Sequence, residues 1–131
     1  MSGVRRLNAG SPWEGVVGYS RVVVRGDAAW VSGTTSTVDG VVTHPGDAGA
    51  QTRRALTIVR DALERAGFSL ADVVRTRIFV TDISRWEEIG RVHGEVFGDV
   101  RPASSMLQVA ALIDPAMLVE IEADAVRGAG A

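Results

Sequence analysis

The pattern of hydrophobic and polar positions predicts six strands. Alternation with a period of two is typical of a strand, because successive side chains point to opposite faces of a sheet. The predicted strands are residues 21–24, 28–32, 41–43, 74–81, 105–112 and 118–126. The first two flank Gly26-Asp27, a two-residue turn signal that predicts a hairpin. The short third strand lies in the Gly- and Thr-rich loop 33–49, and a turn at 113–116 separates the last two.

Two segments have the three- and four-residue spacing of amphipathic helices. In residues 47–66 the apolar positions share one face, arginines and acids occupy the other, and Gly67 provides a stop. A second helix is predicted to begin at Ser84, which together with Glu87 has the spacing of a capping box, and to end at Gly98.

This order of elements predicts one α+β domain over residues 1–131, with a mixed six-stranded sheet in two layers. Strands about 4.8 Å apart make such a sheet wider than about 20 Å, so two helices about 10 Å across cover only one face. We expect the other face to carry Val22 or its neighbours, Phe79 and Met106 among polar groups. An uncovered face of this kind predicts self-association into a closed cyclic oligomer.

The last predicted strand carries three carboxylates on one face. Because strand neighbours alternate, Glu120, Glu122 and Asp124 point away from the apolar residues between them. One interpretation is a solvated face, or ion pairs with Arg75 and Arg77 that contribute about 0–1 kcal/mol each. This is the more common outcome for charged strand faces. The other interpretation is that one carboxylate orients water or a substrate amine in a cleft.

Composition narrows the possible chemistry. All 14 basic residues are Arg, and the chain has no Lys and no Cys. This excludes a Schiff-base or P-loop lysine, a thiolate nucleophile, a disulfide, an iron-sulfur cluster and a thiolate zinc site. The net charge of −2 argues against nucleic acid as a partner. We therefore expect no cofactor and no metal.

We also expect a cytoplasmic protein with no membrane partner. Residues 1–15 contain no apolar run of the roughly 7–15 residues that a signal peptide needs. No segment approaches the roughly 20 apolar residues of a membrane span.

Three local patterns do not support alternative chemistries. His93-Gly94-Glu95 has the H-x-E form of zinc deaminases but lacks their Cys pair. Residues 18–22 approach the G-x-S-x-G motif, but Val22 replaces its last glycine, so a serine hydrolase is not expected. We interpret His93 as a packed histidine on an apolar helix stripe and His44 as a loop residue. Together they provide too few ligands for a metal.

Six short motifs follow one another along the chain. They are Tyr19-Ser20, Trp30 to Gly33, Gln51 to Leu56, Phe79 to Asp82, Arg101 to Ala103 and Val119 to Ala123. In this order and spacing they resemble the RidA/YjgF family, the reactive-intermediate deaminases, over residues 19–126. The resemblance implies a chorismate-mutase-like fold and a homotrimer with a small-molecule ligand in the cleft between subunits. Active members hydrolyse enamines and imines, such as 2-aminoacrylate, to a keto acid and ammonia.

Transferred residue by residue, the resemblance implies that Glu120 is the catalytic residue that positions water. The implied substrate-binding residues are Tyr19, Ser32, Gly33, Gly90, Pro102, Ala103, Ser104 and Met106. Two of them depart from the family pattern: Ser104 replaces the arginine that binds the substrate carboxylate, and Gly90 replaces a frequent Asn. A bidentate Arg–carboxylate contact is roughly twice as strong as a neutral hydrogen bond, so we expect 2-imino acids to bind poorly.

Four other arginines are candidates to replace the missing one: Arg21, Arg75, Arg77 and Arg101. In an extended chain Arg101 lies about 10 Å from Ser104 and on the opposite face, so we interpret it as a solvated loop end. The sequence does not discriminate among the other three.

Two functional hypotheses follow. In the first, the homotrimer is a ligand-binding or pathway-accessory protein and not a 2-imino acid deaminase. In the second, it hydrolyses a reactive enamine, imine or related metabolite that lacks a carboxylate. Glu120 then positions water, pocket amides hold the developing charge, and no covalent intermediate forms. A weaker third hypothesis, an endoribonuclease, follows from the label of some relatives, and the acidic pI of about 5.6 does not favour it.

Overall fold

A computed structural model of the chain describes residues 3–128 and contains a six-stranded sheet with the order β1-β2-β3-β8-β6-β7. The strands are β1 (Val4–Leu7), β2 (Val22–Arg25), β3 (Ala28–Thr34), β6 (Val73–Val80), β7 (Ala103–Gln108) and β8 (Val119–Val126). Only β6 and β7 pair in parallel, so the sheet is mixed. The short strands β4 (Thr37–Val38) and β5 (Val41–Val42) form a separate hairpin.

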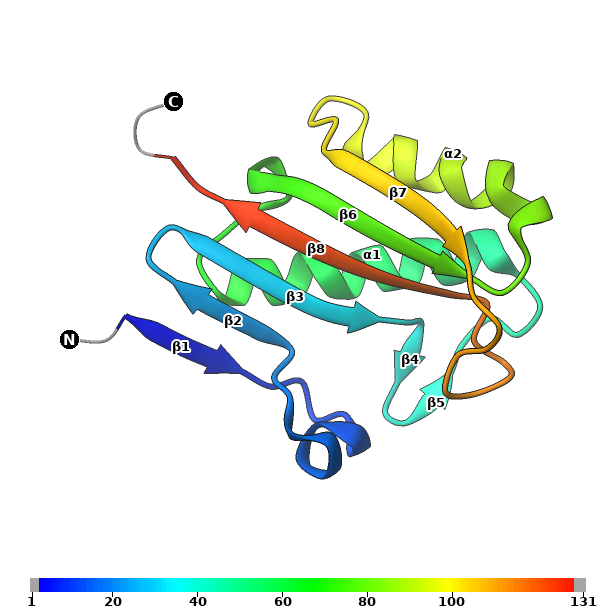
Figure 1. Cartoon of the computed structure of the whole chain (residues 1–131), viewed down its shortest axis with the longest axis horizontal. Coiled ribbons are helices and arrows are strands. Elements are labelled where there is room, and N and C mark those ends of the chain that lie inside the picture. The colour runs from blue at the N-terminus through cyan, green and yellow to red at the C-terminus, as the bar shows by residue number, and fades with distance from the viewer. Residues whose placement is uncertain (1–2, 129–131) are drawn as a thin grey trace.

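Two main helices lie on one side of this sheet: α1 (Ala48–Arg65) and α2 (Trp86–Phe97). Figure 1 shows both of them behind the strands, with α1 behind the centre of the sheet and α2 alongside β7. The α+β two-layer architecture and the helices on a single face are therefore confirmed. Within residues 3–128, none of the helices combines the length and the apolar composition that a membrane-spanning helix requires.

The central strand β8 divides the two faces of the sheet as its alternation predicts. Val119, Ile121, Ala123 and Ala125 are buried in the core between the sheet and the helices. The carboxylate residues between them are half-buried on the opposite face. On the helix side, α1 begins after Asp47, whose side chain accepts a hydrogen bond from Ala50 N at 3.0 Å and caps the helix.

The predicted strands differ from the observed ones at three places. β1 was missed, because its four residues include two arginines and show no clear alternation. It nevertheless pairs with β2 along its whole length and adds an edge strand. β2 lies one residue later than predicted, and β7 covers 103–108 instead of 105–112.

The predicted capping box at Ser84 is wrong. A short 3₁₀ helix (Ile83–Arg85) precedes α2, which starts at Trp86. Asp82 caps this turn: its Oδ1 accepts hydrogen bonds from Ser84 N at 3.0 Å and Ser84 Oγ at 2.6 Å, and these bonds lower the pKa of Asp82. The charged Asp82 side chain is the stronger acceptor, so it takes the capping role two residues before the expected one.

The open face of the sheet differs in part from its predicted content. Val22 is fully buried, and Met106 packs against the core beside Ile78, so neither lies on the open face. The register of strand pairing determines the face on which each residue lies, because residues paired across neighbouring strands point to the same face of the sheet. Instead, the open face exposes Trp30 (45% exposed), which lies between two buried residues of β3, and Leu107 (47% exposed), which pairs with Phe79.

Candidate functional site

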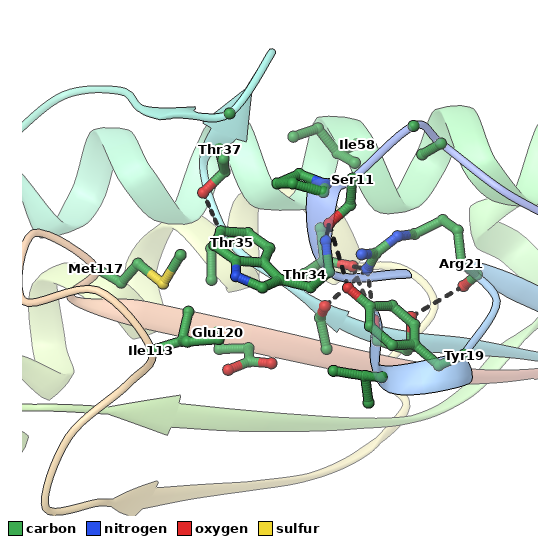
Figure 2. A pocket seen from close by; sticks show the side chains of 18 of the residues that line it. Ser11, Tyr19, Arg21, Thr34, Thr35, Thr37, Ile58, Ile113, Met117 and Glu120 are labelled. Carbon is green, nitrogen blue, oxygen red and sulfur yellow. Dashed lines mark hydrogen bonds between the residues drawn. The ribbon is translucent and has the colours of Figure 1, made fainter. Parts of the chain in front are cut away.

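A pocket of about 360 Å³ lies at one end of the sheet. It is enclosed by residues 9–19, by the end of β3 with the segment after it, and by the chain around Met117. Figure 2 shows Tyr19 and Arg21 on one side of this pocket and Ile113, Met117 and Glu120 on the other. A volume of this size is typical of small-molecule sites.

Glu120 projects into the pocket from β8 and lies against Gly33 of β3. A Cβ atom at Gly33 would lie only 1.8 Å from Glu120 Oε2, so the carboxylate occupies the space that any larger residue would fill. Burial, and secondarily the charge of Glu122, raises the pKa of Glu120, while Arg21 opposes the shift. A carboxyl group of this kind exchanges a proton more readily near neutral pH than an ordinary glutamate does.

The other two carboxylates of β8 behave differently. Arg77 Nη1 lies 3.6 Å from Glu122 Oε1 and 3.4 Å from Asp124 Oδ2, on a partly exposed surface. Ion pairs on this face were one predicted interpretation, and they account for Glu122 and Asp124. Glu120 has no ion pair among the described residues, which leaves its carboxylate available to the pocket.

A β-bulge places Ser32 and Gly33 at the pocket. The register between β3 and β8 shifts between Val31 and Thr34, and Ser32 N donates to Arg21 O at 3.0 Å. The Arg21 side chain supports the same bulge, because its Nη1 donates to Gly33 O at 2.7 Å and to Thr34 Oγ1 at 2.8 Å. Bulges commonly re-aim side chains next to functional sites.

The segment before β2 forms a wall of the pocket that the sequence analysis did not identify. Glu14 is buried, and its carboxylate accepts hydrogen bonds from Ala9 N at 3.2 Å and Ser11 N at 3.4 Å. Ser11 Oγ lies 3.3 Å from the Tyr19 hydroxyl. The S-x-x-E spacing of Ser11 and Glu14, with Pro12 between them, is the sequence signal that predicts such a turn.

A second group of implied site residues lies at the β7 edge of the sheet. Thr76 Oγ1 is fully buried; it lies 2.9 Å from His93 Nε2 and donates to Ser104 Oγ at 2.8 Å. His93 also packs against Phe97, with ring centroids 4.8 Å apart and the rings tilted by 41°, as expected for a packed histidine, and its burial lowers its pKa. The exposed Ser104 hydroxyl therefore ends a hydrogen-bonded chain that starts at a half-buried imidazole.

The predicted site residues thus fall into two groups that one chain does not bring together. Tyr19, Ser32, Gly33 and Glu120 line the pocket. Gly90 on α2, Pro102 just before β7, and Ala103, Ser104 and Met106 on β7 do not line it. Strand β6 separates β7 from β8, and Ser104 shares the helix side of the sheet with Thr76, whereas Glu120 lies on the open side.

The four arginines that the sequence offered as candidates to replace the missing one lie at different places in the structure. Arg75 is exposed on β6, and Arg77 is paired with acids on the open face. Arg101, which has a positive φ of 54°, is exposed and donates from Nε to Gly98 O at 3.2 Å, as expected for a loop end. Arg21 is the one of the four that lines the pocket.

Comparison with known proteins agrees with this fold. The family model of endoribonuclease L-PSP matches residues 11–127. A crystal structure of a YjgF/UK114 family member from Mycobacterium tuberculosis is 52% identical, with a TM-score of 0.86, and covers 95% of this chain and 99% of that one. An uncharacterized protein of Streptomyces coelicolor is 37% identical over 126 residues, 96% of this chain and 94% of its own. The 3-aminoacrylate deaminase RutC of Acinetobacter baylyi is 42% identical over 80 residues, 61% of this chain and 63% of its own.

Proposed function

This chain belongs to the RidA/YjgF family, whose family model carries the name endoribonuclease L-PSP, and we propose that it binds a small organic molecule and hydrolyses its carbon–nitrogen double bond. Glu120 is the residue that positions the water. The single observation that carries this proposal is the Glu120 carboxylate, which lies without an ion-pair partner among residues 3–128 in a partly open pocket and has a raised pKa.

The proposed reaction is an addition of water to an imine carbon. Ionised Glu120 accepts a proton from the water as its oxygen bonds to the carbon, and the electron pair of the double bond moves to nitrogen. Glu120 then returns the proton to nitrogen, which gives a carbinolamine. The hydroxyl proton of the carbinolamine moves to nitrogen through Glu120 as the carbon–nitrogen bond breaks, so ammonia leaves and the carbon–oxygen bond becomes a carbonyl. With an enamine, protonated Glu120 first donates its proton to the enamine carbon, and water then adds to the resulting iminium ion as Glu120 takes a proton from it, which gives the same carbinolamine. The raised pKa of Glu120 suits these proton transfers.

We propose that 2-imino acids are poor substrates of this site. In the family pattern an arginine on β7 binds the substrate carboxylate, and Ser104 stands at that position here. The Ser104 Oγ already accepts a hydrogen bond from Thr76. A hydroxyl group offers one neutral donor in place of a planar, charged pair of donors.

We also propose that a neighbouring copy completes the site in a homotrimer. Ser104 and Met106 lie on the helix side of the sheet and Glu120 on the open side, so we infer that a β7 edge near the pocket comes from another chain. The open face supports this arrangement, because it exposes Trp30 and Leu107 around the charged groups of β6 and β8. Exposed apolar residues on an uncovered sheet face favour association.

Ammonia release tests the hydrolytic proposal. Two substrates are generated in situ: 2-aminoacrylate from serine by a dehydratase, and 3-aminoacrylate, which the name of the Acinetobacter relative suggests. We expect acceleration of 3-aminoacrylate hydrolysis by the wild-type protein, loss of that acceleration in Glu120→Gln, and no acceleration with 2-aminoacrylate. Failure to accelerate 3-aminoacrylate hydrolysis, or an active Glu120→Gln variant, would overturn the proposal.

The companion variant is Ser104→Arg, which restores the family residue. We expect it to gain activity on 2-aminoacrylate. If the variant gains none, the site differs from the deaminases by more than this residue, and the proposed reason for poor 2-imino acid binding is wrong.

A further inference from the structure

Arg21 is a buried cation without a carboxylate partner. It is 7% exposed and is the one arginine that is buried within residues 3–128. Its hydrogen-bond acceptors are neutral: Ser32 O, Gly33 O and Thr34 Oγ1. Within the described chain no carboxylate oxygen lies within 4.0 Å of it. Glu120 attracts Arg21 across the pocket without direct contact, so the buried charge is only partly compensated and an anion in contact with it is favoured.

One edge of the Arg21 guanidinium group is free to bind such an anion. All three side-chain hydrogen bonds of Arg21 come from Nη1, so Nε and Nη2 have no protein acceptor. No buried nitrogen or oxygen of a described side chain lacks a partner, so these two nitrogens are reached from the pocket that Arg21 lines. The Nε–Nη2 edge has the parallel N–H geometry that binds a carboxylate in a bidentate manner.

The surroundings hold this edge in place. The guanidinium carbon lies 5.7 Å from the centroid of the Tyr19 ring, within the range of a cation–π contact. The bonds from Nη1 fix the other end of the group to the bulge in β3. An anchored arginine loses little conformational entropy when it binds a ligand, which favours tight and specific recognition.

We propose that Arg21 is the specificity-determining residue that binds the anionic group of the substrate. This inference rests on the proposed function, and it names the substrate class as a small carboxylic acid whose imine or enamine carbon is not attached directly to the carboxylate. Arg21 thereby takes over, from β2, the recognition that Ser104 does not provide. The hypothesis of a substrate without a carboxylate is replaced by one in which the carboxylate lies at a different place in the pocket.

Gly33 lies between the proposed anion site at Arg21 and the Glu120 carboxylate. Its carbonyl oxygen accepts from Arg21 Nη1 at 2.7 Å, and its Cα side faces the Glu120 carboxylate. The bound carboxylate and the water held by Glu120 therefore lie on either side of one residue. This geometry suits a short acid with at least one further carbon between the carboxylate and the C=N carbon, and not a 2-imino acid, in which the two are attached directly.

Equilibrium binding of benzoate and benzamide tests the proposal without turnover. The two molecules have the same shape, but only benzoate carries a negative charge. We expect the wild-type protein to bind benzoate at least tenfold more tightly, as measured by chemical-shift titration. We expect Arg21→Met to lose this preference and Arg54→Met, an equal charge change at an exposed position of α1, to keep it. Equal binding of the two probes, no measurable benzoate binding, or a preference that persists in Arg21→Met would overturn the proposal.

Arg21→Met removes the support of the bulge, so a second measurement on the wild-type protein is needed. Arg21 lowers the pKa of Glu120, and an anion at Arg21 cancels part of that effect. Benzoate is therefore expected to raise the Glu120 pKa, read from its side-chain carboxyl carbon by NMR, and benzamide to leave it unchanged. No rise with benzoate contradicts the proposal.

Failure of this inference is distinguishable from failure of the proposed function. Glu120→Gln is expected to keep the preference for benzoate while it loses ammonia release. A protein that releases ammonia but shows no preference for benzoate retains the proposed function and excludes the role of Arg21.

Discussion

Replacement of Gly33 by alanine tests whether the position of the Glu120 carboxylate controls activity. The added Cβ would lie 1.8 Å from Glu120 Oε2 and 2.7 Å from its Cδ, whereas real Cβ atoms essentially never approach other atoms closer than 3.0 Å. The carboxylate must therefore move by at least about 1.2 Å, the difference between 3.0 and 1.8 Å. The obstructing atoms are the end of a flexible side chain, so the backbone of the sheet does not have to move.

The expected effect is a loss of catalysis with little loss of stability. A misplacement of about 1 Å costs on the order of 100-fold in rate. Gly33 does not have the left-handed backbone that excludes alanine. The change in the free energy of unfolding should therefore stay within about 1 kcal/mol. Gly94→Ala is the matched control, because a Cβ there meets no atom within 4 Å.

The assay compares kcat/KM for 3-aminoacrylate hydrolysis with the melting temperature of each variant. We expect Gly33→Ala to lose about 100-fold in kcat/KM and to melt close to the wild-type protein, while Gly94→Ala keeps full activity. An active Gly33→Ala protein would refute the reasoning that Gly33 holds the carboxylate in its working position. An unfolded variant would refute the reasoning that only the side chain of Glu120 has to yield.

Three further predictions concern pH, the hydrogen-bonded chain and assembly. Because burial raises the pKa of Glu120, its ionised form weakens the fold above the ordinary value of 4.5. In paired thermal melts Glu120→Gln should therefore be more stable than wild type at neutral pH and equal to it well below 4.5; a destabilised variant at neutral pH contradicts this. Thr76→Val leaves His93 and Ser104 without their shared hydrogen-bond partner and should lower the free energy of unfolding, measured by chemical denaturation, by about 1–3 kcal/mol. Ser104→Ala, at an exposed position, should lower it by less. Equal losses in the two variants would argue against a buried network. Light scattering should give about three times the chain mass of 13.8 kDa, and a stable monomer would exclude the trimer.

Local sequence patterns predict a helix or strand well when its structure depends on residues only a few positions apart in the chain. The 3.6-residue period of α1 and the two-residue period of β8 specify which side chains face the core, and both are as predicted. The edge strand β1 escaped prediction because its stability comes from pairing with β2, about 18 residues later in the chain, and not from its own pattern.

The candidate site was only partly predictable, for the same physical reason. The motifs around Tyr19, Ser32 and Glu120 were visible along the chain, and all three residues line the pocket. Arg21 was one of four candidate arginines, and nothing in the local sequence separated it from Arg75 and Arg77. Its burial depends on hydrogen bonds to Gly33 and Thr34, 12 and 13 positions away.

What the sequence determined by itself is the class of fold, the two faces of β8 and the exclusion of amine and thiol chemistry, since composition and short-range periodicity are enough for these. The tertiary structure alone decided that Val22 and Met106 face the helices, because the register of strand pairing sets the side to which each residue points. It also decided which charges are paired: the fold brings Arg77 to Glu122 and Asp124 and leaves Glu120 and Arg21 facing one pocket. Pairing between charges depends on distances across the sheet, which the order of residues along the chain does not contain.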